Sequence, residues 1–326
     1  MGRRRKPPPG ARAINGWLCV DKPGGISSAG VVARLRTAFK PLRIGHGGTL
    51  DPLATGVLPV ALGEATKTVA YANSGRKSYR FTLRFGECRD TEDAEGAVLE
   101  TSTVRPGDDS INAVLGRFIG TIQQTPPAYS ALKLDGRRAY VRAREGETVV
   151  LPSRPVTVYA LRLVDRPDGD RAVFEVECGK GFYVRALGRD LAAALGTLGY
   201  VLELRRTRVG PFREADAIPL DNLVAMGHSA PAFEHIYPVE TVLDDIPALA
   251  VTGQEAAAIR QGRSVKVLRT GGPGPREESA GAQPSELSDG TVVCAMEGTT
   301  LVALARYHAG EISCRRRMEV RMLWRR

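Results

Sequence analysis

A loop centred on Asp51 holds residue types that could do chemistry. The stretch 45–58 reads GHGGTLDPLATGVL, so this carboxylate stands among glycines and small residues just before an apolar run. Glycine allows positive φ and lets a ligand come close, which would put a substrate within reach of nucleophilic or acid–base chemistry. His46, earlier in the same loop, is a candidate general base. A bare Asp-Pro pair is more often an ordinary turn, so this loop alone assigns no function.

Polar side chains further along the chain could assist such a carboxylate. Tyr183 and Arg185 stand two residues apart in KGFYVR, and Tyr79 lies in the alternating segment KSYRFTLRF. If Asp51 is buried, its pKa would rise, and a nearby cation would offset that penalty. By position alone, a core tyrosine and a surface arginine are the favoured interpretation of Tyr183 and Arg185, and Tyr79 could be a strand tyrosine that fills the core. Asp93, in RDTEDAEG, could equally belong to a solvated acidic turn.

Strands and helices of moderate length must position these residues. Alternating apolar residues predict strands, and a period near 3.6 predicts helices; either Ser27 or Ser28 can cap the first helix. The order of elements shows no regular βαβ repeat, so we expect an α+β (mixed α/β) fold whose sheet is mixed and largely antiparallel. The predicted strands are 17–21, 78–85, 157–163, 172–178, 200–209, 292–296 and 300–307, and the predicted helices are 29–39, 63–71, 110–118, 183–195 and 255–260.

Changes in composition divide the chain into segments. Residues 1–12 contain PPPG and five basic residues without an acid, which predicts a disordered basic arm. Residues 13–245 would form the main domain, with an exposed lobe at about 123–155, where proline, glycine and basic residues break the pattern. Residues 246–326 would form a small β-rich domain, interrupted by a polar, flexible loop at about 270–289.

The charge of the chain is unevenly placed. A formal charge of +10 and a pI near 9.6 suggest an anionic partner. Residues 1–12 and 315–326 together hold eleven basic residues and one acid, which leaves 35 residues of each sign between them. RNA binding by the core would therefore depend on local clusters, although a solvated face is the ordinary alternative. The candidate clusters are RRAYVRAR at 137–144 and the trio Arg205, Arg206 and Arg208.

Several classes of protein are disfavoured by the sequence. No run approaches the roughly 18 apolar residues that cross a membrane, and the first residues lack the apolar stretch of a signal peptide. Five widely spaced cysteines without a CxxC pattern, and four histidines without ligand-like spacing, predict reduced thiols and no metal. No glycine-rich stretch has phosphate-loop spacing, so no cofactor is expected. We expect a cytoplasmic protein.

The whole loop, rather than its aspartate alone, resembles the catalytic loop of TruB-family pseudouridine synthases. DKPGG at 21–25, followed by Ser27 and Ser28, resembles the first motif of that family at the expected interval. The form TLDP with its LPV tail favours TruB over the related RsuA and RluA families. The resemblance covers about 14–245. It implies a pseudouridine-synthase-type sheet flanked by helices, and residues 246–326 more weakly resemble a small PUA-type RNA-binding domain.

This resemblance implies a role for each candidate residue. Asp51 matches the nucleophile and Arg185 its cationic partner, while Tyr79 matches an aromatic that packs on the target uracil and is placed for proton transfer at C5. His46 matches the residue that fills the space left by the flipped base, with general base as the alternative. The other implied positions are Tyr183 and Leu204 at the substrate, Asp93 beside Arg185, and Lys22 in support. No metal ligand is implied.

The implied reaction converts uridine 55 in the T arm of tRNA to pseudouridine. The N1–ribose bond breaks, the base turns, and C5 is joined instead; a carboxylate nucleophile divides this into easier steps. Attack on the base and attack on the ribose both stay open. The expected partner is the T-arm stem-loop without guide RNA, and the expected state is a monomer. The alternatives are a non-catalytic RNA-binding or tRNA-folding protein on this scaffold, and a carboxylate-dependent glycosidase or nucleosidase, which would need a second acid near Asp51.

Overall fold

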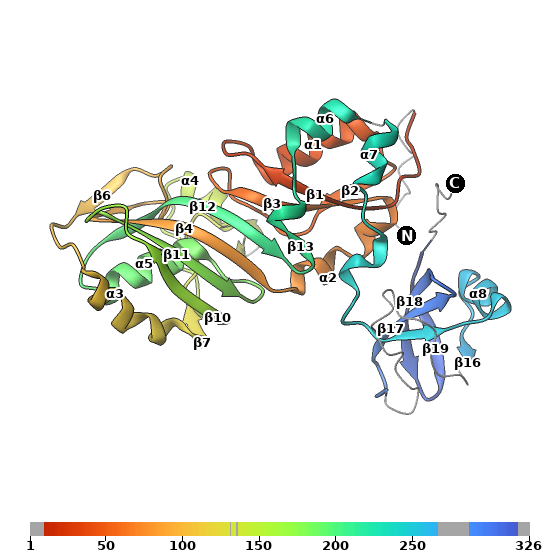
Figure 1. The fold of residues 1–326 in the computed structure, drawn as a ribbon. Helices are drawn as coiled ribbons and strands as arrows, with labels where there is room; N and C mark the ends of the chain where they lie inside the picture. Colours follow the sequence, from red (N-terminus) through yellow and green to blue (C-terminus); the bar gives the residue numbers. More distant parts are fainter. Residues whose placement is uncertain (1–9, 131, 135, 228, 267–286, 319–326) are drawn as a thin grey trace.

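Two larger β-sheets of unequal size, together with two two-stranded sheets, organise the described residues (Figure 1). The computed structural model describes residues 10–130, 132–134, 136–227, 229–266 and 287–318. A ten-stranded sheet with its helices makes up the larger part, and a five-stranded sheet with one helix follows at the C-terminal end. Most of the predicted arm at 1–12 and of the predicted loop at 270–289 lies outside the described residues.

The large sheet is mixed and mostly antiparallel, as predicted. Its main path runs β14-β1-β3-β12-β4-β11-β10-β7, with β2 paired to β3 and β13 to β12. The pairs β1–β14 and β3–β12 are parallel, and the other pairs of this sheet are antiparallel. Its strands are β1 (Gly16–Lys22), β2 (Ile44–His46), β3 (Thr55–Leu62), β4 (Lys77–Phe85), β7 (Gly120–Gln124), β10 (Arg154–Asp165), β11 (Arg171–Cys178), β12 (Gly199–Val209), β13 (Phe212–Arg213) and β14 (Ile218–Pro219).

Helices and one apolar core cover one face of this sheet. Val31, Leu35 and Phe39 recur every four residues on the first helix, which gives it a buried stripe. This stripe packs in the same core as Phe81 on β4 and Leu187 on the fifth helix. Among the helices of the described residues, none combines the length and apolar character needed to span a membrane. The α-helices before the small sheet are α1 (Ser28–Phe39), α2 (Val69–Ser74), α3 (Asp108–Leu115), α4 (Ala139–Arg144), α5 (Val184–Ala194), α6 (Leu220–Met226) and α7 (Ala230–Glu234).

Strand β3 is central to the sheet, and the sequence analysis predicted no strand there. Pro59 lies inside its apolar run, and proline normally excludes a central strand because it cannot donate to the ladder. The strand tolerates Pro59 because β2 and β12, its two partners on the edge opposite β1, pair with only short parts of it. β2 pairs with residues 60–62 and β12 with residues 55–56, so neither ladder includes Pro59. The predicted helix 63–71 is likewise two pieces, a 3₁₀ turn at Gly63–Lys67 followed by α2.

The small sheet has the order β15-β17-β18-β19-β16. The predicted hairpin is present as β17 and β18, and the predicted helix at 255–260 is α8, which begins with a capping box between Thr252 and Glu255. The first residues of the basic segment 315–326, at 315–317, belong to β19. The elements are β15 (Ala248–Ala250), α8 (Gly253–Arg260), β16 (Val265–Lys266), β17 (Val292–Glu297), β18 (Thr300–His308) and β19 (Glu311–Arg317).

A second apolar core joins the two sheets. Trp17 and Cys19 face away from the helix-covered side of β1, because successive side chains alternate along a strand. They share a core with Met296 and Leu304 of the small sheet. The indole Nε1 of Trp17 also donates to the carbonyl of Val239, in the connection between the sheets, at 3.3 Å. This core also includes Val239 and Leu243 of the connection, so the two sheets are linked through one apolar cluster.

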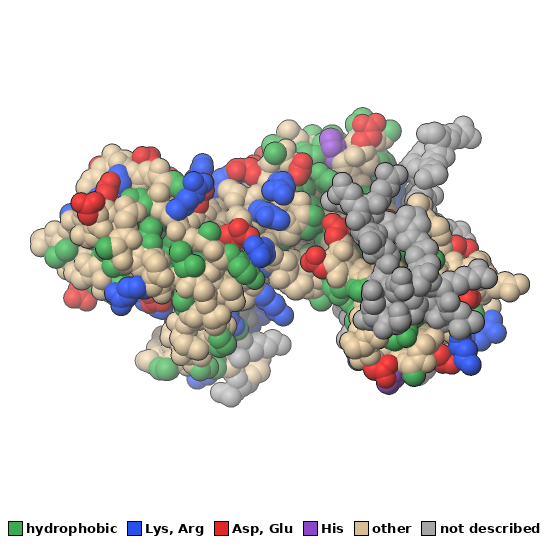
Figure 2. Space-filling view, turned by 60° about the horizontal axis from the view of Figure 1, so that its bottom comes forward, with side chains coloured by type: hydrophobic (Ala, Val, Ile, Leu, Met, Phe, Trp, Pro, Cys, Tyr) green, Lys and Arg blue, Asp and Glu red, His purple; other side chains and the backbone are tan. Residues whose placement is uncertain are grey.

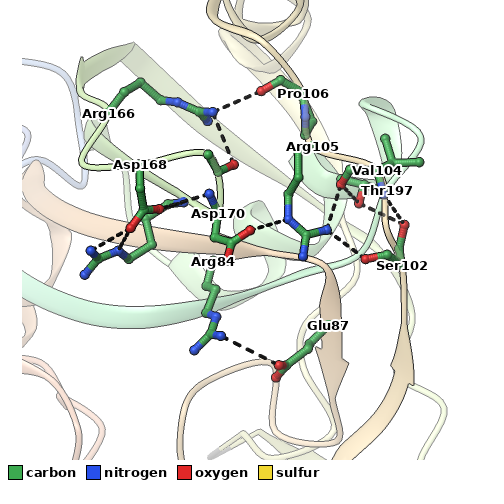
Figure 3. Close-up of polar contacts among 12 residues, drawn as sticks. Arg84, Glu87, Ser102, Val104, Arg105, Pro106, Arg166, Asp168, Asp170 and Thr197 are labelled. Carbon is green, nitrogen blue, oxygen red and sulfur yellow. Dashed lines mark hydrogen bonds and ion pairs between the residues drawn. The ribbon is translucent and has the colours of Figure 1, made fainter.

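Arginine side chains hydrogen-bond to the connecting segments at one end of the large sheet (Figure 3). Beyond the hairpin β5 (Glu87–Arg89) and β6 (Val98–Thr101), Arg105 donates to the carbonyls of Ser102 (2.7 Å) and Val104 (3.1 Å) and pairs with Asp170. Arg166 donates to the carbonyl of Pro106 at 3.1 Å. None of these residues lines the cavities around Asp51 that are described below, so this network braces the scaffold rather than the site.

Candidate active site

Asp51 lies between β2 and β3, at the wall of an open cavity. Its Oδ2 atom is 2.9 Å from Nη2 of Arg185, at the start of α5. Both residues line this inner cavity, which has a volume of about 350 Å³. The Asp51 side chain is 37% exposed and is therefore only partly buried. The exposure follows from its place on an open cavity, and the ion pair with Arg185 holds the carboxylate in position.

Arg185 is fixed from several sides. Its side chain is only 5% exposed, and it donates to the carbonyls of Thr91 (2.8 Å) and Tyr129 (2.9 Å). Its Nε atom lies 3.5 Å from Oδ2 of Asp93, which is an ion pair too long for a good hydrogen bond. Asp93 itself accepts from the Thr91 hydroxyl at 2.6 Å. The guanidinium therefore stands between two carboxylates, with Asp51 on the side that opens to solvent.

Aromatic and aliphatic side chains form the walls of the inner cavity. Tyr79 on β4, Leu204 on β12 and Tyr183 before α5 all line it. Burial raises the pKa of the Tyr79 phenol to about 12, so the hydroxyl is protonated at neutral pH. The backbone of Tyr183 is fixed by the Gln124 side chain, which accepts from its N–H at 2.8 Å and donates to its carbonyl at 3.0 Å. The inner cavity thus combines aromatic and aliphatic walls with one carboxylate, that of Asp51.

His46 lies on a different cavity from the other predicted substrate residues. This outer cavity, of about 620 Å³, shares Asp51 and Arg185 with the inner one and also includes Asp93. Burial and, second, the charge of Arg206 lower the pKa of His46, which keeps its ring neutral at pH 7. Its Nδ1 atom is buried and has no hydrogen-bond partner among the described residues. The predicted site therefore spans two adjoining cavities with Asp51 at their common wall.

Two buried side chains hold the backbone on either side of Asp51. Lys22 is fully buried and donates to the carbonyls of Pro52 (3.0 Å), Ile26 (2.7 Å) and Pro23 (2.8 Å). Ser28, the first residue of α1, accepts from the Leu50 N–H at 2.8 Å and donates to the Leu50 carbonyl at 3.0 Å. The first motif and the Asp51 loop, which are far apart in the sequence, therefore form one structural unit.

Arg206 was missed as a site residue. In the sequence, Arg206 forms a candidate RNA-binding cluster with Arg205 and Arg208, but in the structure it is 1% exposed and lines the inner cavity. Arg205 is paired with Asp21 at 2.9 Å. Alternate residues of a strand share a face. A cavity position for Leu204 therefore implies that Arg206, two residues later, faces the same cavity. Lys77 was missed in the same way: it precedes Tyr79 by two residues on β4 and lines the same cavity.

The predicted exposed lobe brings arginine and tyrosine to the outer cavity. α4 carries Tyr140 and Arg144, and Arg138 directly precedes it. The guanidinium carbons of Arg138 and Arg144 lie 6.0 and 5.6 Å from the centre of the Tyr140 ring, and all three residues line the outer cavity. A stacked base and its phosphate are the ligands that this combination suits.

Family models match most of the large-sheet part of the chain. The model described as TruB family pseudouridylate synthase (N terminal domain) matches residues 36–184, and that of the tRNA pseudouridylate synthase B C-terminal domain matches residues 185–244. A protein of Gluconacetobacter diazotrophicus named tRNA pseudouridine synthase B is 52% identical over 302 residues, covering 92% of this chain and 95% of that protein. This chain belongs to the TruB family. It is an enzyme of the pseudouridine synthase class.

Other TruB relatives agree in length and fold. A protein of Caulobacter vibrioides, also named tRNA pseudouridine synthase B, is 49% identical. The matched region covers 96% of this chain and 97% of that protein. Among solved structures, a Cbf5-Nop10-Gar1 complex contains a chain with a TM-score of 0.67 and 28% identity, covering 89% of this chain and 78% of that one. An H/ACA RNP bound to a substrate RNA containing 2′-deoxyuridine matches with a TM-score of 0.68 and 25% identity, covering 93% and 84%. The pseudouridine-synthase-type fold expected from the Asp51 loop is confirmed.

Proposed function

We propose that this TruB-family enzyme converts uridine 55 in the T arm of tRNA to pseudouridine, with Asp51 as the nucleophile. The observation that carries the proposal is the Asp51–Arg185 ion pair on a cavity walled by Tyr79 and Leu204. The inner cavity, at about 350 Å³, has a size typical of small-molecule sites. Relatives of about 50% identity are named tRNA pseudouridine synthase B, which supports tRNA as the substrate.

The chemistry needs a flipped nucleotide and no co-substrate. The reacting atoms of a stacked uridine are inaccessible, so the base must leave the stack and enter the inner cavity. Asp51 then bonds to the nucleoside, the N1–C1′ bond breaks, the base turns, and C5 bonds to C1′. The bond to Asp51 breaks again in the course of these steps, which returns the free carboxylate. C5 loses a proton and N1 gains one, so the product is an isomer of the substrate. Arg185 would hold the Asp51 carboxylate in position through their ion pair, and Tyr79 would pack on the uracil.

The surrounding residues would bind the rest of the T arm. We assign to His46 the space that the flipped base leaves, because it lies across Asp51 from the inner cavity with a neutral ring. The lobe at 123–155 would act as a thumb on the RNA backbone. Residues 246–326 would form the PUA-like domain, with 13–245 as the catalytic domain. The enzyme would act as a monomer without guide RNA.

The test measures tritium release from a T-arm transcript labelled at C5 of uridine, with the purified protein as the sole addition. We expect release equal to one uridine per transcript with the strand intact, and none when uridine 55 is replaced by cytidine. Asp51→Asn should abolish release while tRNA affinity stays within about tenfold of wild type. Release by Asp51→Asn near the wild-type rate would contradict the nucleophile assignment. Binding of the transcript without release would favour the RNA-folding alternative.

The carboxyl of Glu95 is the observation that favours the glycosidase alternative, and the same transcript tests it. Glu95 lines the outer cavity with Asp51, and partial burial together with the charges of Asp93 and Asp51 raises the pKa of the Glu95 carboxyl. A carboxyl of this kind could act as the second acid that a glycosidase requires. Free uracil and an abasic strand would be its products, whereas pseudouridine in an intact strand excludes it. Nucleoside analysis of the digested transcript separates the two.

A further inference from the structure

We propose that Arg206 is a positioning residue that clamps both ends of the Asp51 loop and joins them to Tyr79. This inference rests on the proposed roles of Asp51 and Tyr79. Arg206 occupies β12 in the middle of the large sheet and is 1% exposed. A fully buried charge is rare unless it is paired. Among the ion pairs between described residues, none includes Arg206, so its environment must satisfy it through hydrogen bonds instead.

Backbone carbonyls of the Asp51 loop supply those hydrogen bonds. Arg206 donates to the carbonyls of Gly48 (3.0 Å) and Thr49 (3.4 Å), which precede Asp51. Its Nε donates to the carbonyl of Val57 (2.8 Å), which follows Asp51. The planar guanidinium thus spans the two ends of a loop that contains the carboxylate. Desolvating this charge is costly, so the loop conformation that supplies all three acceptors is strongly favoured over others.

Two glycines of the loop have the backbone geometry that this clamp requires. Gly56 pairs with Arg206 in the parallel β3–β12 ladder, and a Cβ at Gly56 would lie 2.3 Å from the Arg206 carbonyl oxygen. Gly48 has φ +99°, and a Cβ there would lie 3.4 Å from Nη1 of Arg206. Gly56 therefore needs to be glycine for β3 to approach the β12 backbone, and Gly48 needs to be glycine because of its positive φ. These two glycines let the loop backbone follow the course in which the carbonyls of Gly48, Thr49 and Val57 accept from the Arg206 side chain.

The same guanidinium acts on Tyr79 across the ladder. Arg206 and Tyr79 are register partners between β12 and β4, and both line the inner cavity. Hydrogen bonding and the charge of Arg206 oppose the rise that burial causes in the pKa of Tyr79. Arg206 also contributes to the lowered pKa of His46. One side chain therefore fixes the nucleophile loop and influences two further groups of the site.

A lysine could not replace this arginine. Its ammonium is a point charge on a flexible stem, whereas the guanidinium presents donors in a rigid fork that can reach carbonyls on two strands at once. Arg206→Lys keeps the charge and removes the fork. Arg206→Met removes both. The pair therefore separates positioning of the loop from electrostatic influence on His46.

The experiment measures single-turnover tritium release and tRNA affinity for wild type, Arg206→Lys and Arg206→Met. We expect Arg206→Lys to lower the rate of the chemical step about 100-fold, as a small misplacement of a reacting group does, with tRNA affinity within about threefold. Arg206→Met should lower the rate at least as far and also raise the pKa of His46, followed by the NMR titration of its ring protons. Arg206→Lys should leave that pKa close to the wild-type value.

Arg166→Lys is the matched control, because Arg166 also donates to backbone carbonyls but lines neither cavity (Figure 3). It should change the melting temperature without slowing release. A folded Arg206→Lys protein with a rate within about threefold of wild type, or no slower than Arg166→Lys, overturns the proposal. If Arg206→Lys does not fold, Gly48→Ala disturbs the loop backbone that carries the acceptor carbonyls, because a Cβ is unfavourable at φ +99° and would lie 3.2 Å from Oδ1 of Asn73. Gly48→Ala should slow release in a folded protein, and a normal rate there also overturns the proposal. Absence of release by wild type would instead reject the proposed function.

Discussion

Buried cations, each donating to backbone carbonyls, organise the site at the scale of single residues. Lys22, Arg185 and Arg206 together hold the carbonyls of four segments around Asp51. Sequence patterns identified Asp51 and Arg185 as candidates, because their motifs are distinctive. Arg206 and Lys77 were missed because a basic residue in a strand looks like a surface residue until burial is known. Strand alternation could have identified both, because Arg206 lies two residues after Leu204 and Lys77 lies two residues before Tyr79.

Lys22 makes stability depend on pH in a predictable direction. Burial lowers its pKa from 10.5 to about 8, partly offset by the charge of Asp51. Between these values the unfolded chain carries a proton that the folded protein has lost, so raising the pH across this window favours the folded state. We expect wild type to gain stability relative to Lys22→Met by up to about 1.4 kcal/mol per pH unit.

Urea unfolding of both proteins at intervals between pH 8 and 10 measures this difference. Comparing the two proteins at each pH cancels the titration of the cysteines and of the other groups that they share. A stability difference that stays constant across the window, or that turns against wild type, contradicts the prediction.

At the scale of elements, two adjacent serines have different tasks. The sequence left open which one caps the first helix. Ser27 does so, because its hydroxyl accepts from the Gly30 N–H at 3.1 Å. Ser28 begins α1 and is bonded twice to the backbone of Leu50, next to Asp51. Periodicity could locate this helix within a residue or so, but only packing against the loop could tell the two hydroxyls apart.

Ser28→Ala and Ser27→Ala should therefore differ in their effect on turnover. Ser28→Ala leaves the buried Leu50 amide and carbonyl without partners, at a cost of about 1–3 kcal/mol, and should slow tritium release because the Asp51 loop loosens. Ser27→Ala should cost about 1 kcal/mol through loss of the cap and leave the rate close to wild type. Thermal unfolding and single-turnover rates measure both. Equal rates for the two variants would count against the contact with Leu50.

At the scale of the whole molecule, the two sheets are joined by packing, and charge is dispersed. Trp17 and Met296 belong to one core although they come from different sheets. On the face shown in Figure 2, lysine and arginine side chains lie in separate groups with acidic side chains between them. This agrees with the even charge balance of residues 13–314. Recognition of an anionic ligand must then depend on local features such as the Tyr140 cluster rather than on one continuous basic surface.

The shared core predicts coupled unfolding of the two sheets. Met296→Ala should cost about 2–5 kcal/mol and lower the midpoint of the unfolding transition seen by the fluorescence of Trp17, with Trp324 replaced by phenylalanine in all proteins compared. Val302→Ala is the comparison, because Val302 belongs to the separate core between the small sheet and α8. Val302→Ala should destabilise the small sheet and lower the Trp17 midpoint less than Met296→Ala does. If Met296→Ala leaves the Trp17 midpoint unchanged, the sheets are not coupled through this core.

The sequence by itself determined the family, the mixed sheet and the candidates around Asp51. Local motifs and alternation depend only on residues that are close in the sequence, so they can be recognised without knowledge of distant contacts. It could not locate strand β3, whose proline is tolerated only because short partners flank it. Nor could it show that β19 takes up part of the basic C-terminal segment.

Tertiary structure decided which side chains meet. Arg185 reaches Asp51 from a helix start far along the chain, and His46 shares a different cavity with Asp51 than Tyr79 does. Arg206 changed from a presumed surface charge to a buried clamp, because burial is set by the strands on either side of it. Whether a charged residue contacts solvent or the backbone of a distant loop depends on long-range packing, which local sequence does not encode.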